Sequence, residues 1–133
     1  MRHSEAMCAR CLIVDDNRDF LRVASNLLEH AGIIVAGVAS TSAQASRACR
    51  ELHPDVVLID IDLGDESGLD LARHLVGETG PDQPRVILTS AYSADDFADM
   101  IADLPGVSFL AKAALSGSAV LGALARRGAW PGQ

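Results

Sequence analysis

The sequence lacks the features of membrane and secreted proteins. Its longest apolar run, residues 33–39, is far shorter than the roughly 20 residues that a membrane-spanning helix needs. Before Asp15 there is neither the apolar stretch nor the small-residue cleavage site of a signal peptide. We therefore expect a cytoplasmic protein with no membrane segment.

Cysteine is scarce, and the three cysteines cannot all pair within one chain. Cys8 and Cys11 form a C-x-x-C pattern that precedes an apolar strand, whereas thioredoxin-type pairs follow a strand at a helix N-terminus. Only His3 lies near enough in sequence to act as a further zinc ligand. We expect Cys11 to be a buried strand residue and Cys8 to belong to a loose tail, with no metal or redox role.

Basic residues are also few. Eleven Lys and Arg against 18 Asp and Glu leave a formal charge of -7, which would repel the phosphate backbone of nucleic acids. We expect no direct contact with nucleic acid. Ten of the eleven bases are arginines, so Lys112 is the only lysine. The chain of 133 residues, 49% of them hydrophobic, is long enough for one core and too short for a second, substrate-binding lobe.

Short apolar runs alternate with helical patterns along the chain. Apolar, β-branched runs predict buried strands at residues 11–14, 33–38, 56–59, 86–88 and 107–110. Apolar spacings of three and four predict helices at residues 18–31, from Thr41 or Ser42 to 52, at 68–76, at 93–103, and from Ser116 or Ser118 to a point before Gly128. Such strands, separated by helices, predict an α/β fold with a doubly wound, five-stranded parallel sheet and five helices.

Polar residues follow four of the predicted strands. In doubly wound sheets the working residues lie beyond the carboxyl ends of the strands. These positions hold Asp15 and Asp16 after the first strand, Asp60 after the third, Thr89 and Ser90 after the fourth, and Lys112 after the fifth. Converging carboxylates repel one another by on the order of 4 kcal/mol per pair at about 4 Å and an effective dielectric constant of about 20. Mg²⁺, which prefers oxygen ligands, and a lysine ammonium would compensate this repulsion.

The same residue types suit phosphoryl transfer. An aspartate beside Mg²⁺, an ammonium and a hydroxyl can attack phosphorus in line, because each of the three partners can stabilise one equatorial oxygen. A single aspartate at a strand end is more often a helix cap or a solvated loop residue. Four strand ends that carry such residues together favour a site.

With these motifs the sequence resembles the receiver domain of two-component response regulators, from about residue 11 to residue 127. The matching segments occur in the order and spacing of the family: LIVDDN at 12–17, PDVVLIDIDL at 54–63, SGLDL at 67–71, VILTS at 86–90 and FLAK at 109–112. The resemblance implies a flavodoxin-like sheet with strand order 2-1-3-4-5. It also implies a receiver domain at residues 11–127 between tails at 1–10 and 128–133.

The resemblance implies a role for each motif residue. Asp60 would accept a phosphoryl group from a sensor histidine kinase or a phosphotransfer protein. Asp15, Asp16, Asp60 and the backbone carbonyl of Asp62 would hold Mg²⁺, and Thr89 and Lys112 would contact the phosphoryl oxygens. The protein would then be a stand-alone, CheY-like regulator that signals by protein contact and acts on no separate substrate as an enzyme.

The resemblance also implies how the signal would leave the site. Thr89 and Phe109 would be switch residues that couple Asp60 to the face formed by the fourth helix, fifth strand and fifth helix. A downstream protein or a second copy of the chain would bind this face. Asp62 and Ala91 stand at the positions that flank the water that hydrolyses the phosphorylated aspartate in this family.

Three departures from the family pattern affect these expectations. Ala113 replaces the proline that usually follows the lysine in a cis peptide, so we expect a trans Lys112–Ala113 bond. Gly64 stands where proline is common, which predicts a more flexible loop. Phe109 lacks the hydroxyl of the commoner tyrosine, so packing alone would hold any inward state.

Two alternative functions remain. The Ala113 departure keeps open an unphosphorylated adaptor that binds partners constitutively. Asp60-Ile61-Asp62 also fits the Asp-x-Asp motif of haloacid-dehalogenase-type phosphohydrolases. That family needs an acidic pair after its lysine, and residues 113–133 contain no Asp or Glu, so the hydrolase is disfavoured.

Overall fold

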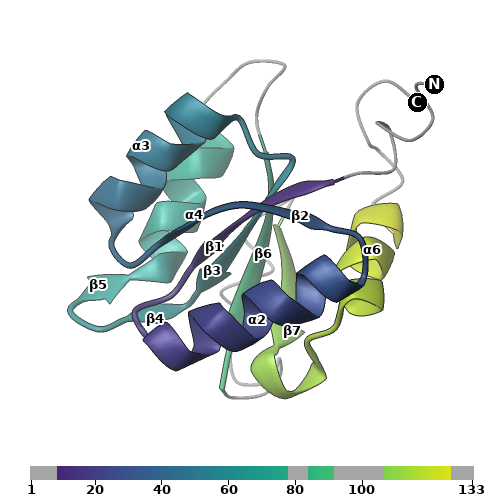
Figure 1. The fold of residues 1–133 in the computed structure, drawn as a ribbon. Helices are drawn as coiled ribbons and strands as arrows, with labels where there is room; N and C mark the ends of the chain where they lie inside the picture. Colours follow the sequence, from purple (N-terminus) through teal and green to yellow (C-terminus); the bar gives the residue numbers. More distant parts are fainter. Residues whose placement is uncertain (1–8, 78–83, 92–106, 127–133) are drawn as a thin grey trace.

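A five-stranded parallel sheet forms the centre of the computed structural model, which describes residues 9–77, 84–91 and 107–126 (Figure 1). The strand order is β2-β1-β3-β6-β7, and every neighbouring pair is parallel. The strands are β1 (Arg10–Val14), β2 (Ile34–Ala39), β3 (Val56–Asp60), β6 (Arg85–Ser90) and β7 (Val107–Ala111). This is the predicted doubly wound, flavodoxin-like order, and the order of the strands reverses at β1.

Four α-helices connect or follow the strands among the described residues: α2 (Arg18–His30), α3 (Ser42–Leu52), α4 (Gly68–Gly77) and α6 (Gly117–Arg126). Side-chain caps explain where three of them begin. Asn17 Oδ1 accepts from the Phe20 N–H, Thr41 Oγ1 from the Gln44 N–H, and Ser116 Oγ from the Ala119 N–H. Of the predicted alternatives, Thr41 rather than Ser42 caps α3, and Ser116 rather than Ser118 caps α6. The helix predicted at 93–103 lies outside the described residues.

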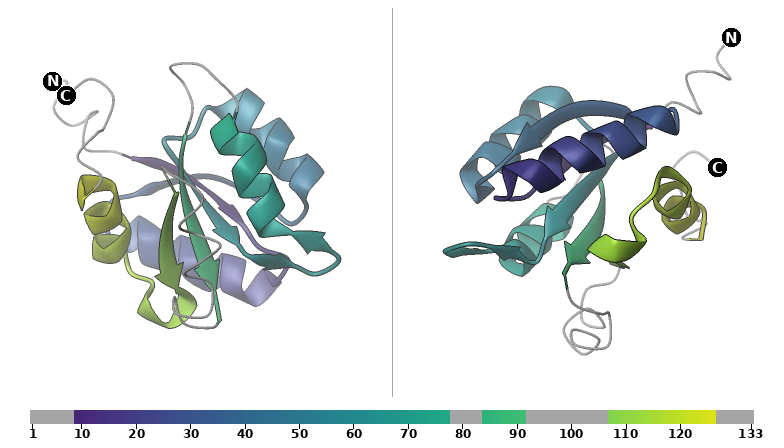
Figure 2. Two further views of the ribbon diagram at one scale, coloured as in Figure 1. Left: turned by 180° about the vertical axis from the view of Figure 1, so that it is seen from behind. Right: turned by 60° about the horizontal axis from the view of Figure 1, so that its bottom comes forward.

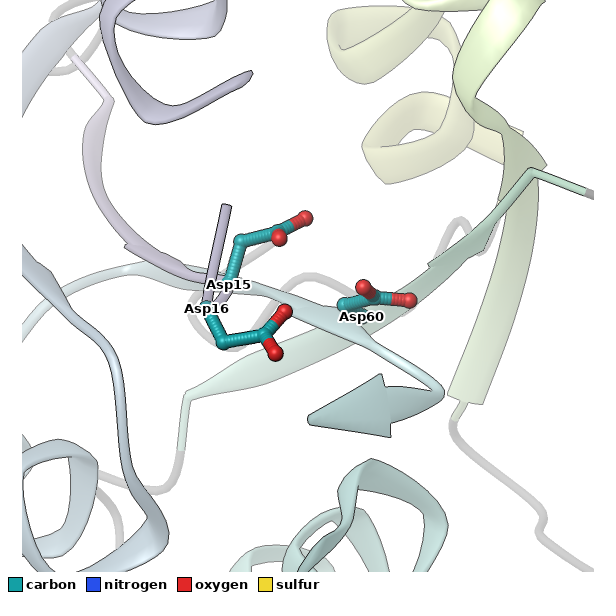
Figure 3. A group of neighbouring side chains, drawn as sticks. All are labelled: Asp15, Asp16 and Asp60. Carbon is teal, nitrogen blue, oxygen red and sulfur yellow. The ribbon is translucent and has the colours of Figure 1, made fainter. Parts of the chain in front are cut away.

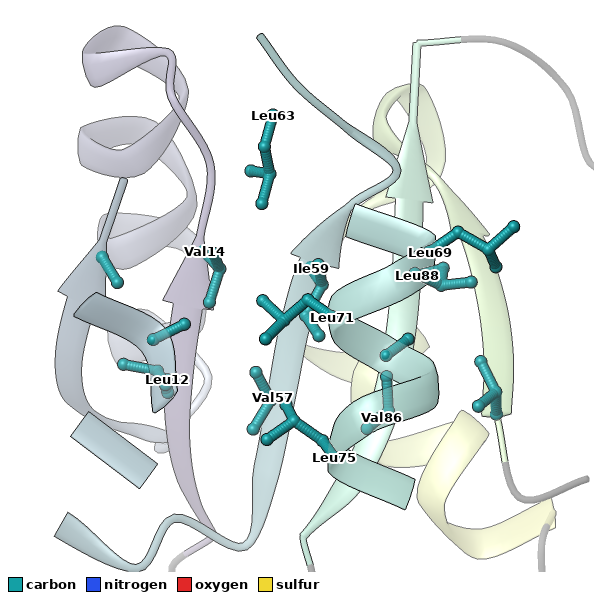
Figure 4. Packing of buried hydrophobic residues seen from close by; sticks show 14 residues of the cluster. Leu12, Val14, Val57, Ile59, Leu63, Leu69, Leu71, Leu75, Val86 and Leu88 are labelled. Atoms are coloured by element: carbon teal, nitrogen blue, oxygen red, sulfur yellow. The ribbon is translucent and has the colours of Figure 1, made fainter. Parts of the chain in front are cut away.

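Two hydrophobic clusters cover opposite faces of the sheet. Helices α3 and α4 pack on one face, where Leu71 and Leu75 of α4 lie over Val57 and Ile59 of β3 (Figure 4). Helices α2 and α6 pack on the other face, as the opposite views show (Figures 1 and 2). Because the inner strands are covered on both sides, their residues must be apolar throughout, which is why they read as continuous apolar runs.

The approach of α2 to α6 depends on a small residue. A side chain on Gly117 would place its Cβ 2.0 Å from the Ala31 Cβ. Cys11 is fully buried in the cluster beneath these helices, and burial raises the pKa of its thiol to about 12. Cys11 is therefore a core residue, as predicted, whereas Cys8 lies outside the described residues. No helix in the described part of the chain combines the length and apolar character required to span a membrane.

The segment after β3 forms a small hairpin that the sequence analysis did not predict. Strands β4 (Asp62–Leu63) and β5 (Glu66–Ser67) pair antiparallel and project from the end of the sheet (Figure 2). Glu66 Oε1 accepts a hydrogen bond of 2.8 Å from the Ser42 N–H at the start of α3. This contact ties the segment that follows Asp60 to a helix on the sheet, so the loop is held at both ends.

Candidate functional site

The predicted site residues meet at the carboxyl ends of the strands. Asp15 and Asp16 directly follow β1, and Asp60 is the last residue of β3. Figure 3 shows Asp15 and Asp16 extending towards the side where Asp60 lies. One carboxylate oxygen from each residue lies within 4.8 Å of the other two. The doubly wound topology thus brings together Asp15 and Asp60, which are 45 residues apart in the sequence.

The three carboxylates differ in exposure. Asp15 is completely buried, Asp60 is nearly buried and Asp16 is exposed. Asp15 Oδ1 accepts from the Asn17 N–H at 2.9 Å, which leaves Asp15 Oδ2 as a buried oxygen with no aligned hydrogen bond among the described residues. A buried carboxylate oxygen beside two further carboxylates is a donor set that suits a hard divalent cation.

Lys112 supplies the positive charge at this edge. It begins the short 3₁₀ helix η2 (Lys112–Ala114), directly after β7. Its Nζ lies 2.7 Å from Asp15 Oδ2 as a close ion pair, and it donates a hydrogen bond of 3.2 Å to Asp60 Oδ2. Burial lowers the pKa of Lys112, but the two carboxylates outweigh that effect and the net pKa is raised. Lys112 is therefore a fixed cation at neutral pH.

The pKa of Asp60 depends on opposing effects of burial and of its neighbours. Burial raises its pKa above the ordinary value of 3.8, and the negative charge of Asp15 adds to the increase. The Asp62 N–H, which donates to Asp60 Oδ1 at 3.2 Å, and the ammonium of Lys112 act in the opposite direction without cancelling the increase. A carboxylate with a raised pKa is more basic than an exposed aspartate, which favours its use as a nucleophile.

A pocket of about 430 Å³ opens above this cluster. It is lined by Asp16, Asn17, Asp60, Ile61, Asp62, Gly64, Ser90, Ala91 and Lys112. The walls carry carboxylates, an ammonium and loop backbone, while Asp15 lies buried beneath them. The pocket has room for a small anionic group beside Asp60.

The structure also locates the predicted switch residues. Thr89 is buried and pairs with Asp60 between β3 and β6, and its carbonyl accepts from the Ile61 N–H at 2.9 Å. Phe109 lies on β7 opposite Leu88 and packs, partly buried, against the core on the α3 and α4 side. Strand β6 lies between Phe109 and the strand that ends at Asp60. The fourth helix of the expected docking face lies outside the described residues.

Two glycines explain how the loop after Asp60 fits. Gly64 has a φ of +74°, and a Cβ there would lie 2.9 Å from Asp16 Oδ2. Proline cannot adopt a positive φ, so this loop conformation excludes the residue that is common at this position in the family. A Cβ on Gly68 would lie 1.8 Å from the Asp60 carbonyl oxygen. The Lys112–Ala113 peptide bond is trans, as expected, since the described chain has no cis bond.

One contact of the site was missed by the sequence analysis. The ring of Phe20 lies against Lys112, with Nζ 4.3 Å from the ring centroid. Phe20 opens the apolar stripe of the first predicted helix, so its spacing indicates a core residue. Its position one turn after the Asp15-Asp16 pair is the only signal in the sequence that could have placed it near the site.

Most of the chain is similar to known proteins. The family model described as "Response regulator receiver domain" matches residues 11–120. The chain is 36% identical over 86 residues to the DNA-binding response regulator MtrA of Mycobacterium tuberculosis, which covers 65% of this chain and 36% of that protein. It is 30% identical over 86 residues to a protein-glutamate methylesterase/protein-glutamine glutaminase of Halobacterium salinarum, which covers 64% of this chain and 24% of that protein.

Among solved structures, the chain is similar to a CheY-like response regulator receiver domain from Methylobacillus flagellatus. The TM-score is 0.74 at 22% identity, over 90% of this chain and 98% of that one. This likeness concerns the fold. The chain spans only about a quarter to a third of the length of the curated relatives that it matches.

Proposed function

The chain belongs to the response regulator receiver family of two-component systems, and on that premise we propose that Asp60 accepts a phosphoryl group from the phosphohistidine of a sensor kinase or phosphotransfer protein. One observation carries the proposal: a nearly buried aspartate with a raised pKa lies at the floor of an open pocket, between two further carboxylates and the only lysine of the chain. Phosphorylated Asp60 then signals by protein contact.

The transfer requires one bond to form and one to break. A carboxylate oxygen of Asp60 attacks the phosphorus atom, the phosphorus–nitrogen bond of the phosphohistidine breaks, and its electron pair stays with the imidazole. Burial raises the pKa of Asp60 because its ionised form is less well solvated, and a less solvated carboxylate oxygen attacks more readily. The Asp62 N–H holds one carboxylate oxygen at 3.2 Å and thereby orients the group towards the pocket.

The acidic cluster fits Mg²⁺. The carboxylates of Asp15, Asp16 and Asp60, with the backbone carbonyl of Asp62, would hold the ion. When bound, Mg²⁺ neutralises the excess negative charge and polarises the phosphoryl oxygens. The three carboxylates share one ammonium, that of Lys112, and this excess of negative charge supports the assignment.

Lys112 and Thr89 complete the proposed phosphoryl site. The ammonium of Lys112 already lies 3.2 Å from Asp60 Oδ2, so it can bind an oxygen of a phosphoryl group attached to Asp60. Thr89, at the paired position on β6, would offer its hydroxyl to a second oxygen. Movement of Thr89 towards the phosphoryl group, with Phe109, would change the face of the fourth helix, fifth strand and fifth helix that a target protein or a second copy binds.

The phosphoryl group would be lost by hydrolysis within the same site. Ala91 lines the pocket and is exposed, and Asp62 lines the opposite loop, so a water molecule can approach between them. The protein would therefore catalyse only its own phosphorylation and dephosphorylation. We propose a receiver unit over residues 11–127 that meets its partners in the cytoplasm.

Mass measurement tests the proposal. The protein is incubated with Mg²⁺ and a small acyl phosphate, and the intact mass is expected to rise by one phosphoryl group. Asp60→Asn should abolish the adduct, whereas Asp70→Asn, which alters an exposed acid on α4, should retain it. No adduct with any donor would instead support a constitutive adaptor. Rapid turnover of varied phosphate esters would support a hydrolase.

A further inference from the structure

The ammonium of Lys112 has a third neighbour besides the two aspartates. The Phe20 ring centroid lies 4.3 Å from Nζ, well within the roughly 6 Å over which a cation is attracted to an aromatic face. The Lys112 side chain is only 20% exposed, so water screens this attraction less than it would at the surface. The contact is therefore electrostatic as well as apolar.

A chain of hydrogen bonds holds the backbone of Phe20 near the site. The Asn17 N–H donates to Asp15 Oδ1 at 2.9 Å, and Asn17 Oδ1 in turn accepts from the Phe20 N–H at 3.1 Å. The residue that caps α2 is thus anchored through its backbone on a carboxylate of the site. Phe20 stands in the first turn of this capped helix, so its backbone is held relative to Asp15 and not only by packing.

The aspartates and the ring hold Lys112 in different ways. Both aspartates are shared, since a divalent cation competes for their oxygens and a phosphoryl group on Asp60 moves the negative charge from the carboxylate onto the phosphoryl oxygens. The Phe20 ring is neutral and has no oxygen that a divalent cation could bind. Its contact with Lys112 therefore does not depend on whether the cation or the phosphoryl group is present. Without this contact, the flexible side chain of Lys112 would adopt many conformations once the two carboxylates no longer bound it.

We infer that Phe20 is a positioning residue that keeps the Lys112 ammonium at the pocket while its carboxylate partners are engaged elsewhere. This role rests on the proposed function, because it concerns the transfer of a phosphoryl group to Asp60. The contact that Phe20 makes at the site is with the Lys112 ammonium. Phe20 acts through Lys112.

The contact can be measured without any phosphorylation. Because Lys112 is the only lysine, ¹³C-labelled lysine gives one side-chain signal set in the whole protein. The ring current of Phe20 should shift the ε-methylene protons upfield of an exposed lysine, and Phe20→Leu should remove that shift while Phe20→Tyr preserves it. An ε-methylene signal at the exposed position in the unmodified protein would overturn the inference.

The role in transfer is tested by changing the electronic character of the ring at nearly constant shape. Phenylalanines with one, two and three fluorine atoms at position 20 withdraw density from the π face, so the rate of phosphorylation by an acyl phosphate should fall stepwise. Phe20→Leu should lower the rate about three- to tenfold, and Phe20→Tyr should restore it. Leu21→Val is the matched control, because it disturbs the buried face of the same helix without contacting Lys112.

The outcomes are distinguishable. A stepwise fall with fluorination, together with an unchanged rate in Leu21→Val, supports the positioning role. Equal rates across the fluorinated series, in a protein whose Asp60 is phosphorylated, overturn it. Absence of phosphorylation in the unmodified protein refutes the proposed function itself, and that result does not depend on the residue at position 20.

Discussion

Removing the ammonium from the acidic cluster should cost far more stability than removing a cation from a surface pair of the same length. Lys112 Nζ lies 3.2 Å from Asp60 Oδ2, and an Arg73 nitrogen lies 3.3 Å from Asp70 Oδ1. Coulomb's law gives about 5 kcal/mol for each pair at an effective dielectric constant of about 20, so distance alone does not separate them. Burial does: the Lys112 side chain is 20% exposed and Asp60 10%, against 49% for Arg73 and 75% for Asp70.

The expected magnitudes follow from that difference. Arg73→Met removes an exposed pair that solvent already screens, so the free energy of unfolding should fall by less than about 1 kcal/mol. Lys112→Met leaves a fully buried Asp15 and a nearly buried Asp60 without their countercharge, so the loss should be about 3–5 kcal/mol. The same loss should shrink in an Asp15→Asn background, because less unpaired charge then remains.

Urea unfolding at pH 7 in the presence of a chelator measures both variants. The pKa of Lys112 is raised above 10.5, so its stabilising contribution should be complete at neutral pH and disappear only as the pH rises through the higher folded-state value. Equal losses for Lys112→Met and Arg73→Met would refute the reasoning. So would a difference between wild type and Lys112→Met that vanished near neutral pH.

Three further predictions concern the same edge of the sheet. Because burial raises the pKa of Asp60 above 3.8, its ionised form opposes folding; Asp60→Asn should therefore stabilise the protein at pH 7, and the gain should fade as the pH falls towards 3.8 in a series of urea titrations. Gly68→Ala should destabilise the protein by about 3 kcal/mol, since its Cβ would lie 1.8 Å from a backbone oxygen, while Gly77→Ala, with nothing within 4 Å, should be neutral or slightly stabilising in the same assay. Mg²⁺ at about 100 times its dissociation constant should add about 2.7 kcal/mol to wild-type stability, and Asp16→Asn should lose most of this increment in calorimetry; an undiminished increment would exclude Asp16 as a ligand.

The strands and the carboxylate cluster could be predicted because they depend on local pattern and on topology. Apolar runs such as residues 56–59 are continuous only when both faces of a strand are covered. Parallel strands then deliver their C-terminal residues to one edge, which brings Asp15, Asp60 and Lys112 together without knowledge of any distance. The caps at Thr41 and Ser116 follow from the same local logic.

Other features could not be predicted, because they depend on which distant atoms meet. The helical spacing predicts that Phe20 faces the core. It does not predict that Lys112, 92 positions later in the sequence, lies against the ring. The requirement for glycine at 64 and 68 comes from the Asp16 carboxylate and the Asp60 carbonyl, neither of which is a sequence neighbour. The β4–β5 hairpin has two residues in each strand, too few for an alternating pattern to register.

The burial of the only lysine has a practical consequence for chemical modification. Acylating reagents need an uncharged, accessible side-chain amine, and Asp15 and Asp60 hold Lys112 as a cation. No other lysine competes for the reagent, so acylation at this side chain occurs only when the carboxylates release it. With a reagent that reacts slowly relative to reclosing, the acylation rate therefore measures the fraction of molecules in which the site is open.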